Sequence, residues 1–523
     1  MFRGAFRQKR KRLYAALLAC SIVFSTFFLG CLEDKKDALP ANTEGLTLIT
    51  LGVLQGNMAP FERHYSRGRV RHFGDPARVA SVVNRLVEDA KKRGRHPIVV
   101  DLGDNLSGSA EALFTKGAIT ARVLADMPLQ ASLLGNLEFA HGQKALTEYF
   151  TKLKVPFIGS NIGAEKGGSL PFANQFVHLN AGKLKVTLAG LVPPNLKFVC
   201  LPGNVSGISV MEGINEPFKA AGKAKSKNGS NLLIMLTQES LGTHFAGFKE
   251  ALKGSGIDIL FGLDFDREGE IKIVEGARVM AFPGHNQGQR VRVTELDVHP
   301  KNGIVKVDSW FEIVDADVEK PNPKIQAYLE EARKKFKAAL DKEIGKAEKY
   351  CNREFWTDGD TGNILTDALR EKTGADLAVV NSGGVASALA PGPILLRDLY
   401  RVIPYQNSIA VLEVKGKDLI RFLNETLGRG SPLQVSNLFL RLNRIDGARG
   451  FRVVHALHKG SDISPSKTYK IVTNDFVLGR SPQLVPLKGI ETGPLMRDVL
   501  IEYLKKHNPL PRPKRGRVVI EGE

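Results

Sequence analysis

Short apolar runs alternate with helical patterns along the chain from residue 46 onward. Residues 46–50, 97–101, 232–236 and 257–261 are mostly apolar and of strand length, which predicts buried strands. Residues 79–93 lie between the first two runs and carry apolar side chains at helical spacing, which predicts an amphipathic helix. Strands that alternate with helices indicate an α/β fold.

A long, highly charged helical pattern occupies most of residues 321–351, and a new mixture of strand and helix patterns follows it. A change of this kind indicates a boundary between domains. We therefore predict a first domain over residues 46–318, a linker helix over residues 319–350 and a second α/β domain over residues 351–523.

Basic residues and an apolar segment open the chain. Six Lys or Arg residues precede residue 13, residues 13–30 are uncharged and mostly apolar, and a charged stretch follows at 33–36. This order is typical of a secretory signal. Because Gly30 and Cys31 close the apolar segment, it resembles a bacterial lipoprotein signal. The resemblance implies a signal peptide over residues 1–31, lipidation of Cys31 and a tether over residues 32–45.

An uncleaved signal anchor is the alternative for this segment, since the apolar run is close to the lower length limit of a membrane span. Both alternatives predict export. We expect a protein attached to the membrane of the bacterial cell envelope, on its periplasmic side or at the cell surface.

The composition is that of a globular protein. The 523 residues are 43% hydrophobic and 25% charged, which excludes a disordered, collagen-like or coiled-coil chain. The formal net charge is +19, and +13 remains without the basic N-terminal run. Since the Lys and Arg residues are dispersed rather than interleaved with aromatic residues, we predict no nucleic-acid partner.

Four cysteines in so long a chain do not make a disulfide framework, and no CxxC pair indicates zinc. Cys200 and Cys351 would be the only thiols of a mature lipoprotein, one in each predicted domain. The sequence leaves open whether they form a disulfide or remain free thiols.

Polar segments follow the predicted strands at residues 52–60, 101–105 and 134–142, and side chains at strand ends carry the chemistry of open α/β sheets. In order and spacing these segments, with 156–162 and 284–288, resemble the N-terminal domain of the 5′-nucleotidase family of two-metal phosphoesterases. Segments 361–370, 374–376, 381–385, 398–407 and 472–476 resemble its C-terminal, nucleotide-binding domain. The resemblance implies a four-layered metallophosphatase-like β-sandwich with flanking helices, then a linker helix and a second α/β domain.

The resemblance also implies two divalent metal ions, and it assigns their ligands to Val53, Gln55, Asp104, Asn136, Gln238, Leu263 and Phe265. Only Asp104 and Asn136 keep the expected residue type. The His-Asp pair that the family uses beside the second metal falls at Leu137 and Ala140. We therefore expect no metal cofactor and no catalytic residue, with Asp104 and Asn136 as vestigial ligands.

Other readings of this site stay open. A shift of one residue would place Asp264 or Asp266 at a ligand position. Nearby histidines are the other possible source of ligands for a rebuilt metal site: His64, His72, His141, His244 and His285. Asp104 and Asn136 each follow a glycine, where they would also serve to hold a turn.

The C-terminal segments retain part of a nucleotide site. Family members sandwich the nucleobase between two aromatic rings, which correspond here to Tyr405 and Phe476, and Asn381 would hydrogen-bond the base or the ribose. The Arg that usually follows the Asn381 loop is Ala386, and residues 479–482 replace the glycine-rich segment after the second ring. The alternative is that both aromatic residues belong to the core.

The sequence therefore predicts an exported lipoprotein of 5′-nucleotidase type that has lost catalysis and binds a nucleoside-like small molecule or a cell-envelope partner. One alternative is an active phosphoester hydrolase of nucleotide breakdown with a rebuilt metal site. The other is a purely structural surface lipoprotein.

Overall fold

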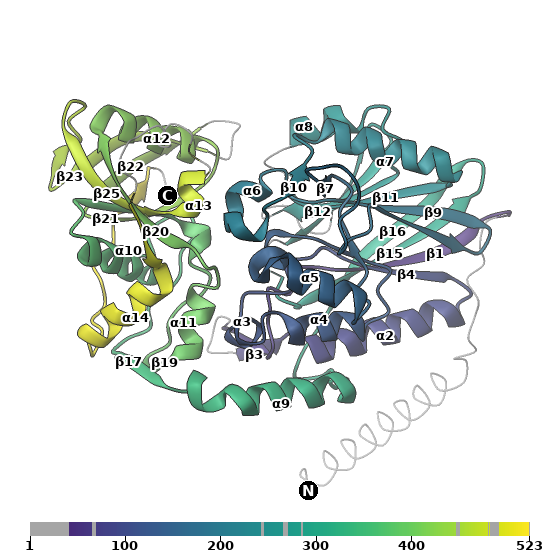
Figure 1. Cartoon of the computed structure of the whole chain (residues 1–523), viewed down its shortest axis with the longest axis horizontal. Coiled ribbons are helices and arrows are strands. Elements are labelled where there is room, and N and C mark those ends of the chain that lie inside the picture. The colour runs from purple at the N-terminus through teal and green to yellow at the C-terminus, as the bar shows by residue number, and fades with distance from the viewer. Residues whose placement is uncertain are drawn as a thin grey trace, which may run out of the picture.

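Two six-stranded sheets build the first domain (Figure 1). This is a computed structural model that describes residues 41–64, 70–241, 245–264, 270–283, 286–445, 450–479, 481 and 491–521. The first sheet has the order β16 (Gly303–Ile313), β15 (Arg290–His299), β1 (Glu44–Leu51), β4 (His96–Asp101), β5 (Ala131–Leu133), β6 (Phe157–Ile158). The second has the order β13 (Ile271–Val274), β14 (Ala277–Pro283), β12 (Ile259–Asp264), β11 (Leu232–Ser240), β9 (Leu184–Leu191), β8 (Phe176–Ala181).

The two sheets pack face to face, because their inward side chains share one buried core that includes Leu48 of β1, Leu188 of β9 and Leu236 of β11. Helices α2 (Pro76–Lys92), α4 (Ala118–Ala125) and α9 (Pro323–Leu340) cover the outer face of the first sheet. Helices α7 (Asn215–Asn228) and α8 (Phe245–Leu252) cover that of the second. The predicted four-layered α/β arrangement is thus confirmed.

The predicted helix between the first two strands is α2, which starts three residues earlier than expected. Asp75 caps it by accepting a hydrogen bond from Arg78 N at 2.9 Å, and Pro76 occupies the first helical position. Shorter elements complete the domain: β2 (Phe61–His64), β3 (Val70–Phe73), α3 (Ala110–Phe114), α5 (Gly142–Thr151), β7 (Ile162–Ala164), α6 (Leu196–Val199) and β10 (Ile208–Val210).

The second domain centres on a five-stranded sheet of order β21 (Leu433–Ser436), β18 (Leu377–Asn381), β25 (Thr468–Asn474), β20 (Ser408–Lys415), β26 (Glu491–Leu495). Helices α10 (Asp360–Thr373), α11 (Leu396–Val402) and α14 (Met496–Lys506) pack on one face, and α12 (Gly416–Gly428) packs on the other. Next to α12 lies a four-stranded sheet of order β24 (Ser461–Asp462), β23 (Phe451–His458), β22 (Phe439–Arg444), β27 (Val518–Ile520). A short helix, α13 (Asp475–Gly479), follows β25.

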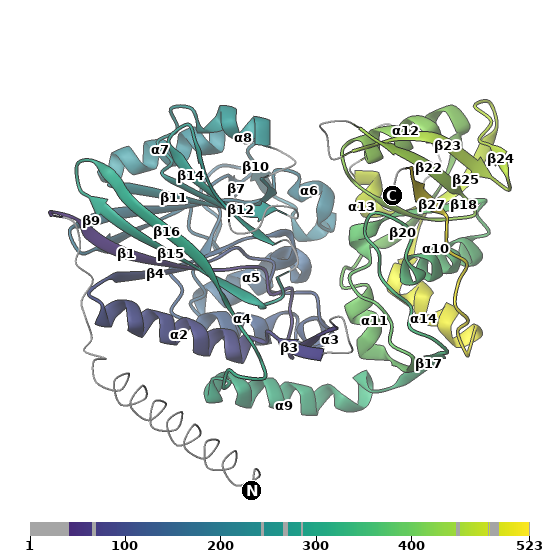
Figure 2. The ribbon, with the colours of Figure 1, turned by 180° about the vertical axis from the view of Figure 1, so that it is seen from behind.

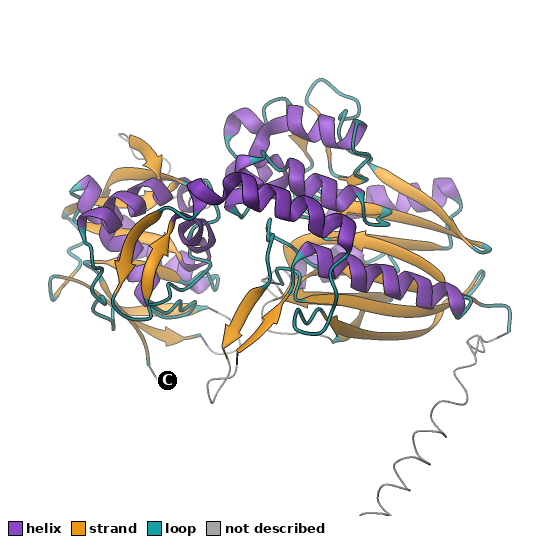
Figure 3. Cartoon of the chain, turned by 90° about the horizontal axis from the view of Figure 1, so that it is seen from below, coloured by secondary structure: helices purple, strands orange, loops and turns teal. Residues whose placement is uncertain are grey.

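The linker helix is shorter than the predicted residues 319–350. Helix α9 ends at Leu340, and β17 (Glu343–Ala347) pairs with β19 (Gly392–Leu395) inside the second domain (Figure 3). The pairing partner lies about 50 residues further along the chain, so the local pattern of charged residues does not reveal it.

Helix α11 of the second domain packs against α3 and α9. The ring of Phe114 on α3 lies 5.4 Å from that of Phe336 on α9 and 6.0 Å from that of Tyr400 on α11. Arg397 forms an ion pair with Asp341 at 2.5 Å, beyond the end of α9. Aromatic packing and charge thus join the two domains on the linker side.

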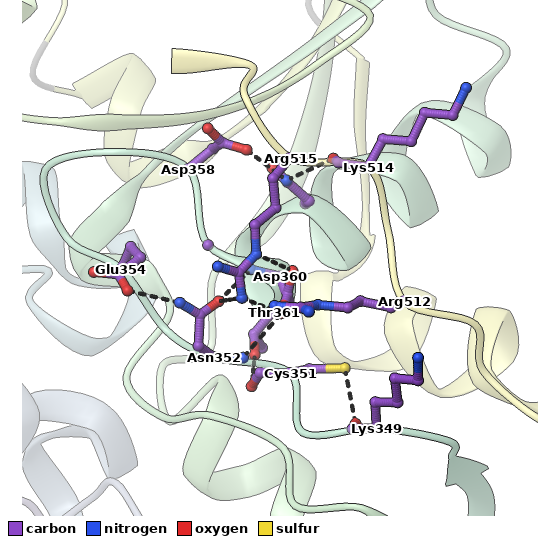
Figure 4. A network of polar contacts seen from close by, with 12 residues as sticks. Lys349, Cys351, Asn352, Glu354, Asp358, Asp360, Thr361, Arg512, Lys514 and Arg515 are labelled. Atoms are coloured by element: carbon purple, nitrogen blue, oxygen red, sulfur yellow. Dashed lines mark hydrogen bonds and ion pairs between the residues drawn. The ribbon is translucent and has the colours of Figure 1, made fainter. Parts of the chain in front are cut away.

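The C-terminal segment after α14 crosses the second domain and is held by buried carboxylates (Figure 4). Asp360, whose side chain is 0% exposed, pairs with Arg512 at 3.1 Å and with Arg515 at 2.5 Å. Asp358 accepts hydrogen bonds from the backbone N–H groups of residues 516, 517 and 518. These contacts place β27 beside β22 as the last strand.

Cys31, with the predicted signal and most of the tether, lies outside the described residues. Within the described ranges, helices long and apolar enough for a membrane span are absent. Cys200 and Cys351 are free thiols, the first half-buried and the second buried.

Candidate functional site

The loop after β4 carries Asp104. Gly103 and Asp104 follow one another with φ of +77° and +57°. A Cβ on Gly103 would lie 2.2 Å from the Leu133 carbonyl oxygen, so only glycine lets this loop pass the end of β5. Asp104 Oδ1 accepts a hydrogen bond from Leu137 N at 3.0 Å. The Asp104 carboxylate therefore joins the loop after β4 to the loop after β5.

Asn136 begins a short 3₁₀ turn after β5, and Glu138 in the same turn is fully buried. The Glu138 carboxylate accepts hydrogen bonds from Asp104 N at 2.9 Å, Asn105 N at 2.6 Å and Gly135 N at 2.7 Å. Both loops are thus tied to one acidic side chain. These hydrogen bonds give Glu138 a structural role.

Gln238 at the end of β11 lies beside Asp104. A Cβ on Gly135 would approach Gln238 Nε2 to 2.2 Å and Asp104 Oδ1 to 2.3 Å, so the amide and the carboxylate lie next to each other over this glycine. Val53 and Leu263 are 1% and 9% exposed and belong to the core between the sheets. An amide and two aliphatic side chains therefore stand where the resemblance implied metal donors.

The donors that the structure describes do not fit two metal ions. Two dications need a bridging carboxylate and several charged or imidazole donors. Across the residues that the structure describes, no group of three His, Cys, Asp or Glu side chains is arranged to bind a metal. Leu137 is 5% exposed and offers no donor. Phe265, Asp266 and the side chain of Asp264 lie outside the described residues.

The histidines considered for a rebuilt site have other partners where they are described. His72 Nδ1 lies 2.9 Å from an Asp317 carboxylate oxygen at the surface. His141 Nε2 lies 3.0 Å from the Leu106 carbonyl oxygen, and burial lowers its pKa. His244, His285 and the side chain of His64 lie outside the described residues.

The buried carboxyl groups of the loop cluster are unusually weak acids. Burial raises the pKa of Asp101 to about 7 and that of Asp104 to about 6. Burial, followed by the charge of Asp104, also raises the pKa of Glu138. The cluster therefore holds protons near neutral pH that exposed carboxylates would have released.

Tyr405 brings the second domain to this cluster. Its side chain is half-buried, and burial together with the Asp104 carboxylate raises its pKa to about 12. Phe476 lies on α13, which packs against α6 (Figure 1). Cys200, directly after α6, donates to the Asn136 carbonyl oxygen at 3.5 Å. Residues predicted in two separate domains thus meet at one place on the domain boundary.

Neither predicted ring is a core residue of the kind that the alternative reading required. Tyr405 and Phe476 are both half-buried, and neither belongs to the hydrophobic clusters of the second domain. Asn381 ends β18, where its Oδ1 accepts a hydrogen bond from Asn474 Nδ2 at 3.1 Å. Asn474 is the residue before α13, so Asn381 and Phe476 share one local framework.

Arg353 is a candidate that sequence reasoning missed. Its Nε donates to the Val385 carbonyl oxygen at 3.0 Å, its guanidinium lies 5.0 Å from the centre of the Phe355 ring, and its charge interacts with Tyr405. Among the described residues its Nη2 atom has no hydrogen-bond partner. Burial lowers its pKa. The signal in the sequence was an Arg close to the aromatic pair Phe355 and Trp356, a few residues before α10.

Comparisons with known proteins agree with this architecture. Residues 339–482 match the family described as 5′-nucleotidase, C-terminal domain. The chain is 24% identical to Endonuclease YhcR of Bacillus subtilis (strain 168), over 83% of this chain and 38% of that protein. It is also 24% identical to an Apyrase of Anopheles gambiae, over 85% of each chain.

Among solved structures, a 5′-nucleotidase precursor from Thermus thermophilus superimposes with a TM-score of 0.78 at 21% identity, over 92% of this chain and 100% of that one. At this identity the likeness shows the fold alone. Together with the match of the C-terminal domain and the order of the motifs, it supports one conclusion. Residues 339–482 belong to the 5′-nucleotidase C-terminal domain family, within a chain that shares the fold of a solved 5′-nucleotidase.

Proposed function

We propose that this chain is an exported, lipid-anchored member of the family that binds a nucleoside-like ligand through its C-terminal domain and does not hydrolyse phosphoesters. The observation that carries the loss of hydrolysis is the environment of Asp104. The Gln238 amide lies against its carboxylate, and the apolar Val53 and Leu263 side chains belong to the core. A cation placed there would lack the charged ligands that offset its dehydration.

Ligand binding is supported by the two aromatic rings at the domain boundary. Tyr405 and Phe476 are only half-buried, and stacking a base on flat aromatic faces needs no charge. Arg353 adds one donor, Nη2, that has no acceptor among the described residues and lies close to Tyr405. The same surface would serve a cell-envelope partner with an aromatic or planar group.

Metal analysis and phosphatase assays test the loss of hydrolysis. We expect the purified full chain to hold no stoichiometric pair of metal ions and to turn over neither adenosine monophosphate nor an aryl phosphate above background, with and without added divalent metals. Asp104→Asn keeps an acceptor for Leu137 N and should leave this background unchanged. Metal-dependent turnover that disappears in Asp104→Asn would instead establish the active hydrolase.

Calorimetric titration of the full chain with adenosine and its monophosphate tests the ligand site. We expect weak binding of both, and a loss of about 1–3 kcal/mol of binding free energy in Tyr405→Ala or Phe476→Ala. Arg353→Ala should remove only the extra affinity of the monophosphate, about 1 kcal/mol or less, because its guanidinium faces no nucleoside charge.

Tyr350→Ala is the matched control, since this ring of the same domain is 53% exposed. It should bind both compounds as the unchanged chain does. If neither compound binds the unchanged chain, or if the two ring variants bind normally, the structural-lipoprotein alternative takes first place.

A further inference from the structure

The amino ends of the parallel strands β1, β4, β9 and β11 lie at the end of the first domain opposite to Asp104 and Asn136. The candidate site follows the carboxyl ends of β4, β5 and β11, so it occupies the other end of the same sheets. Figures 1 and 2 show the start of β1 and the β8–β9 connection at the end far from the second domain.

Five exposed lysines gather at this amino end. Lys92 ends α2, Lys183 lies in the β8–β9 turn with Lys185 just after it, Lys227 lies in the last turn of α7, and Lys301 lies in the β15–β16 turn. None of the five forms an ion pair with a described residue that the structure records. We call these five residues the basic pole.

Contacts between the turns show that the basic pole is one surface. A Cβ on Gly182 would approach Glu44 Oε2 to 2.3 Å and His96 Nε2 to 2.5 Å, which places the Lys183 turn against the starts of β1 and β4. Asn231 accepts a hydrogen bond from Lys185 N at 2.8 Å and donates to the Pro300 carbonyl oxygen at 2.8 Å. The Lys185 and Lys301 segments are therefore neighbours.

Acidic side chains do not cancel this charge. Glu88 forms an ion pair with Lys91 at 2.8 Å, and Glu44 lies 3.4 Å from His96. Two acidic residues remain exposed at this end, Asp89 beside Lys92 on α2 and Glu275 in the turn before β14. Five lysines against two such carboxylates leave a net positive surface.

The chain enters the first domain at the basic pole. Glu44 begins β1, and the sequence before it carries the apolar segment 13–30 and Cys31. The 13 residues from Cys31 to Glu44 span at most about 45 Å when fully extended. If Cys31 is anchored as the proposed function states, the basic pole is the part of the described body that the bilayer can reach first.

We propose that the basic pole docks on the headgroups of an anionic phospholipid bilayer and holds the candidate site on the side away from the membrane. Lysines near an anionic bilayer are attracted within a Debye length, and an attached anchor keeps them within that range. The docking depends on the proposed anchoring to bring the basic pole close to the bilayer. The charge complementarity between the lysines and the anionic headgroups does not depend on the anchor.

Lysine labelling of the full chain on vesicles tests the docking. The chain is reconstituted with phosphatidylcholine vesicles and with vesicles that contain about one-third phosphatidylglycerol, and brief acetylation is read by mass spectrometry. We expect acetylation of Lys183, Lys227 and Lys301 to fall about threefold or more on the anionic vesicles, and to recover in about 0.5 M NaCl. Exposed lysines of the second domain, Lys415, Lys417 and Lys459, should be labelled equally on both.

Charge reversal provides matched variants. A variant with Lys183→Glu, Lys227→Glu and Lys301→Glu should lose the protection of Lys185, whereas Lys415→Glu, Lys417→Glu and Lys459→Glu together should keep it. Equal labelling of the basic pole and the control lysines on both vesicles would overturn the docking, even if the chain floats with both. Protection on anionic vesicles by a chain that does not float with phosphatidylcholine would uphold the docking and reject the anchor.

Discussion

Replacing Asp360 with alanine is expected to lower the free energy of unfolding of the second domain by about 2–4 kcal/mol. The buried carboxylate accepts hydrogen bonds from Arg512 Nε at 3.1 Å, Arg515 Nε at 2.6 Å and Asn352 N at 3.3 Å. The variant leaves this N–H and two guanidinium groups without their acceptor. The arginine side chains are 45% and 39% exposed and regain water, which keeps the loss below that of a fully buried pair.

Urea unfolding followed by fluorescence measures this loss. Trp356 lies in the second domain, with its ring 5.7 Å from that of Phe451, and Trp310→Phe removes the tryptophan of the first domain. Glu371→Ala is the matched control, because Glu371 joins α10 to Lys506 at the end of α14 and to His507 just after it, but is 36% exposed. It should cost less than about 1 kcal/mol. An Asp360→Ala protein as stable as the control would contradict the role assigned to this carboxylate.

The Asp360 network also bears on the ligand site. Asn352 Oδ1 accepts a hydrogen bond from Asp360 N at 3.0 Å and another from Arg515 Nη2 at 2.7 Å, and Asn352 directly precedes Arg353. The segment that presents Arg353 toward Tyr405 is thus fixed from behind by the C-terminal segment. Arg515 of the C-terminal segment therefore helps to hold Arg353 in place at the domain boundary.

The elements that were predicted correctly from the sequence are those whose formation depends on neighbouring residues. The first strands and α2 were predicted because buried apolar runs and the helical spacing of apolar residues depend on neighbouring residues alone. The end of α9 was not, because β17 forms by pairing with β19, about 50 residues away. Non-local hydrogen bonds decided between helix and strand in that segment.

The candidate site divides in the same way. The polar segments that contain Asp104 and Asn136 were recognised by their place after predicted strands, and the family resemblance assigned roles to these two residues as it did to Tyr405 and Phe476. Arg353 was missed because its significance lies in contacts with Val385 and Tyr405, over 30 residues away. The position of the Gln238 amide against Asp104 likewise arises from β11 and β4 meeting in space across two sheets. No local pattern reports such a contact.

The free energy of unfolding of the first domain is expected to fall as pH rises from 5 to 7, by about 1.4 kcal/mol per pH unit for each carboxyl group involved. Burial raises the pKa of Asp101 from an ordinary 3.8 to about 7. Between these values the folded protein holds a proton on Asp101 that the unfolded chain has released. The stabilisation is thus complete at acid pH and is lost as pH rises through 7.

Asp101→Asn isolates this contribution. Asp101 Oδ2 accepts hydrogen bonds from Gly103 N at 3.1 Å, Asn105 Nδ2 at 2.7 Å and Ser132 Oγ at 2.7 Å, and Oδ1 is buried without a partner among the described residues. The asparagine carbonyl oxygen can accept the same three bonds, so the amide imitates the protonated acid. Urea unfolding at pH 5, 6 and 7 should show a slope smaller by about 1.4 kcal/mol per pH unit than that of the unchanged chain.

Asp104 and Glu138 have pKa values raised in the same direction, so part of the pH dependence should remain in Asp101→Asn. The exposed Asp89 on α2 supplies the control, and Asp89→Asn should keep the full slope. A slope that Asp101→Asn leaves unchanged would mean that Asp101 is ionised in the folded protein. Its buried charge would then be stabilised by the three hydrogen bonds that Oδ2 accepts, which oppose the effect of burial on its pKa.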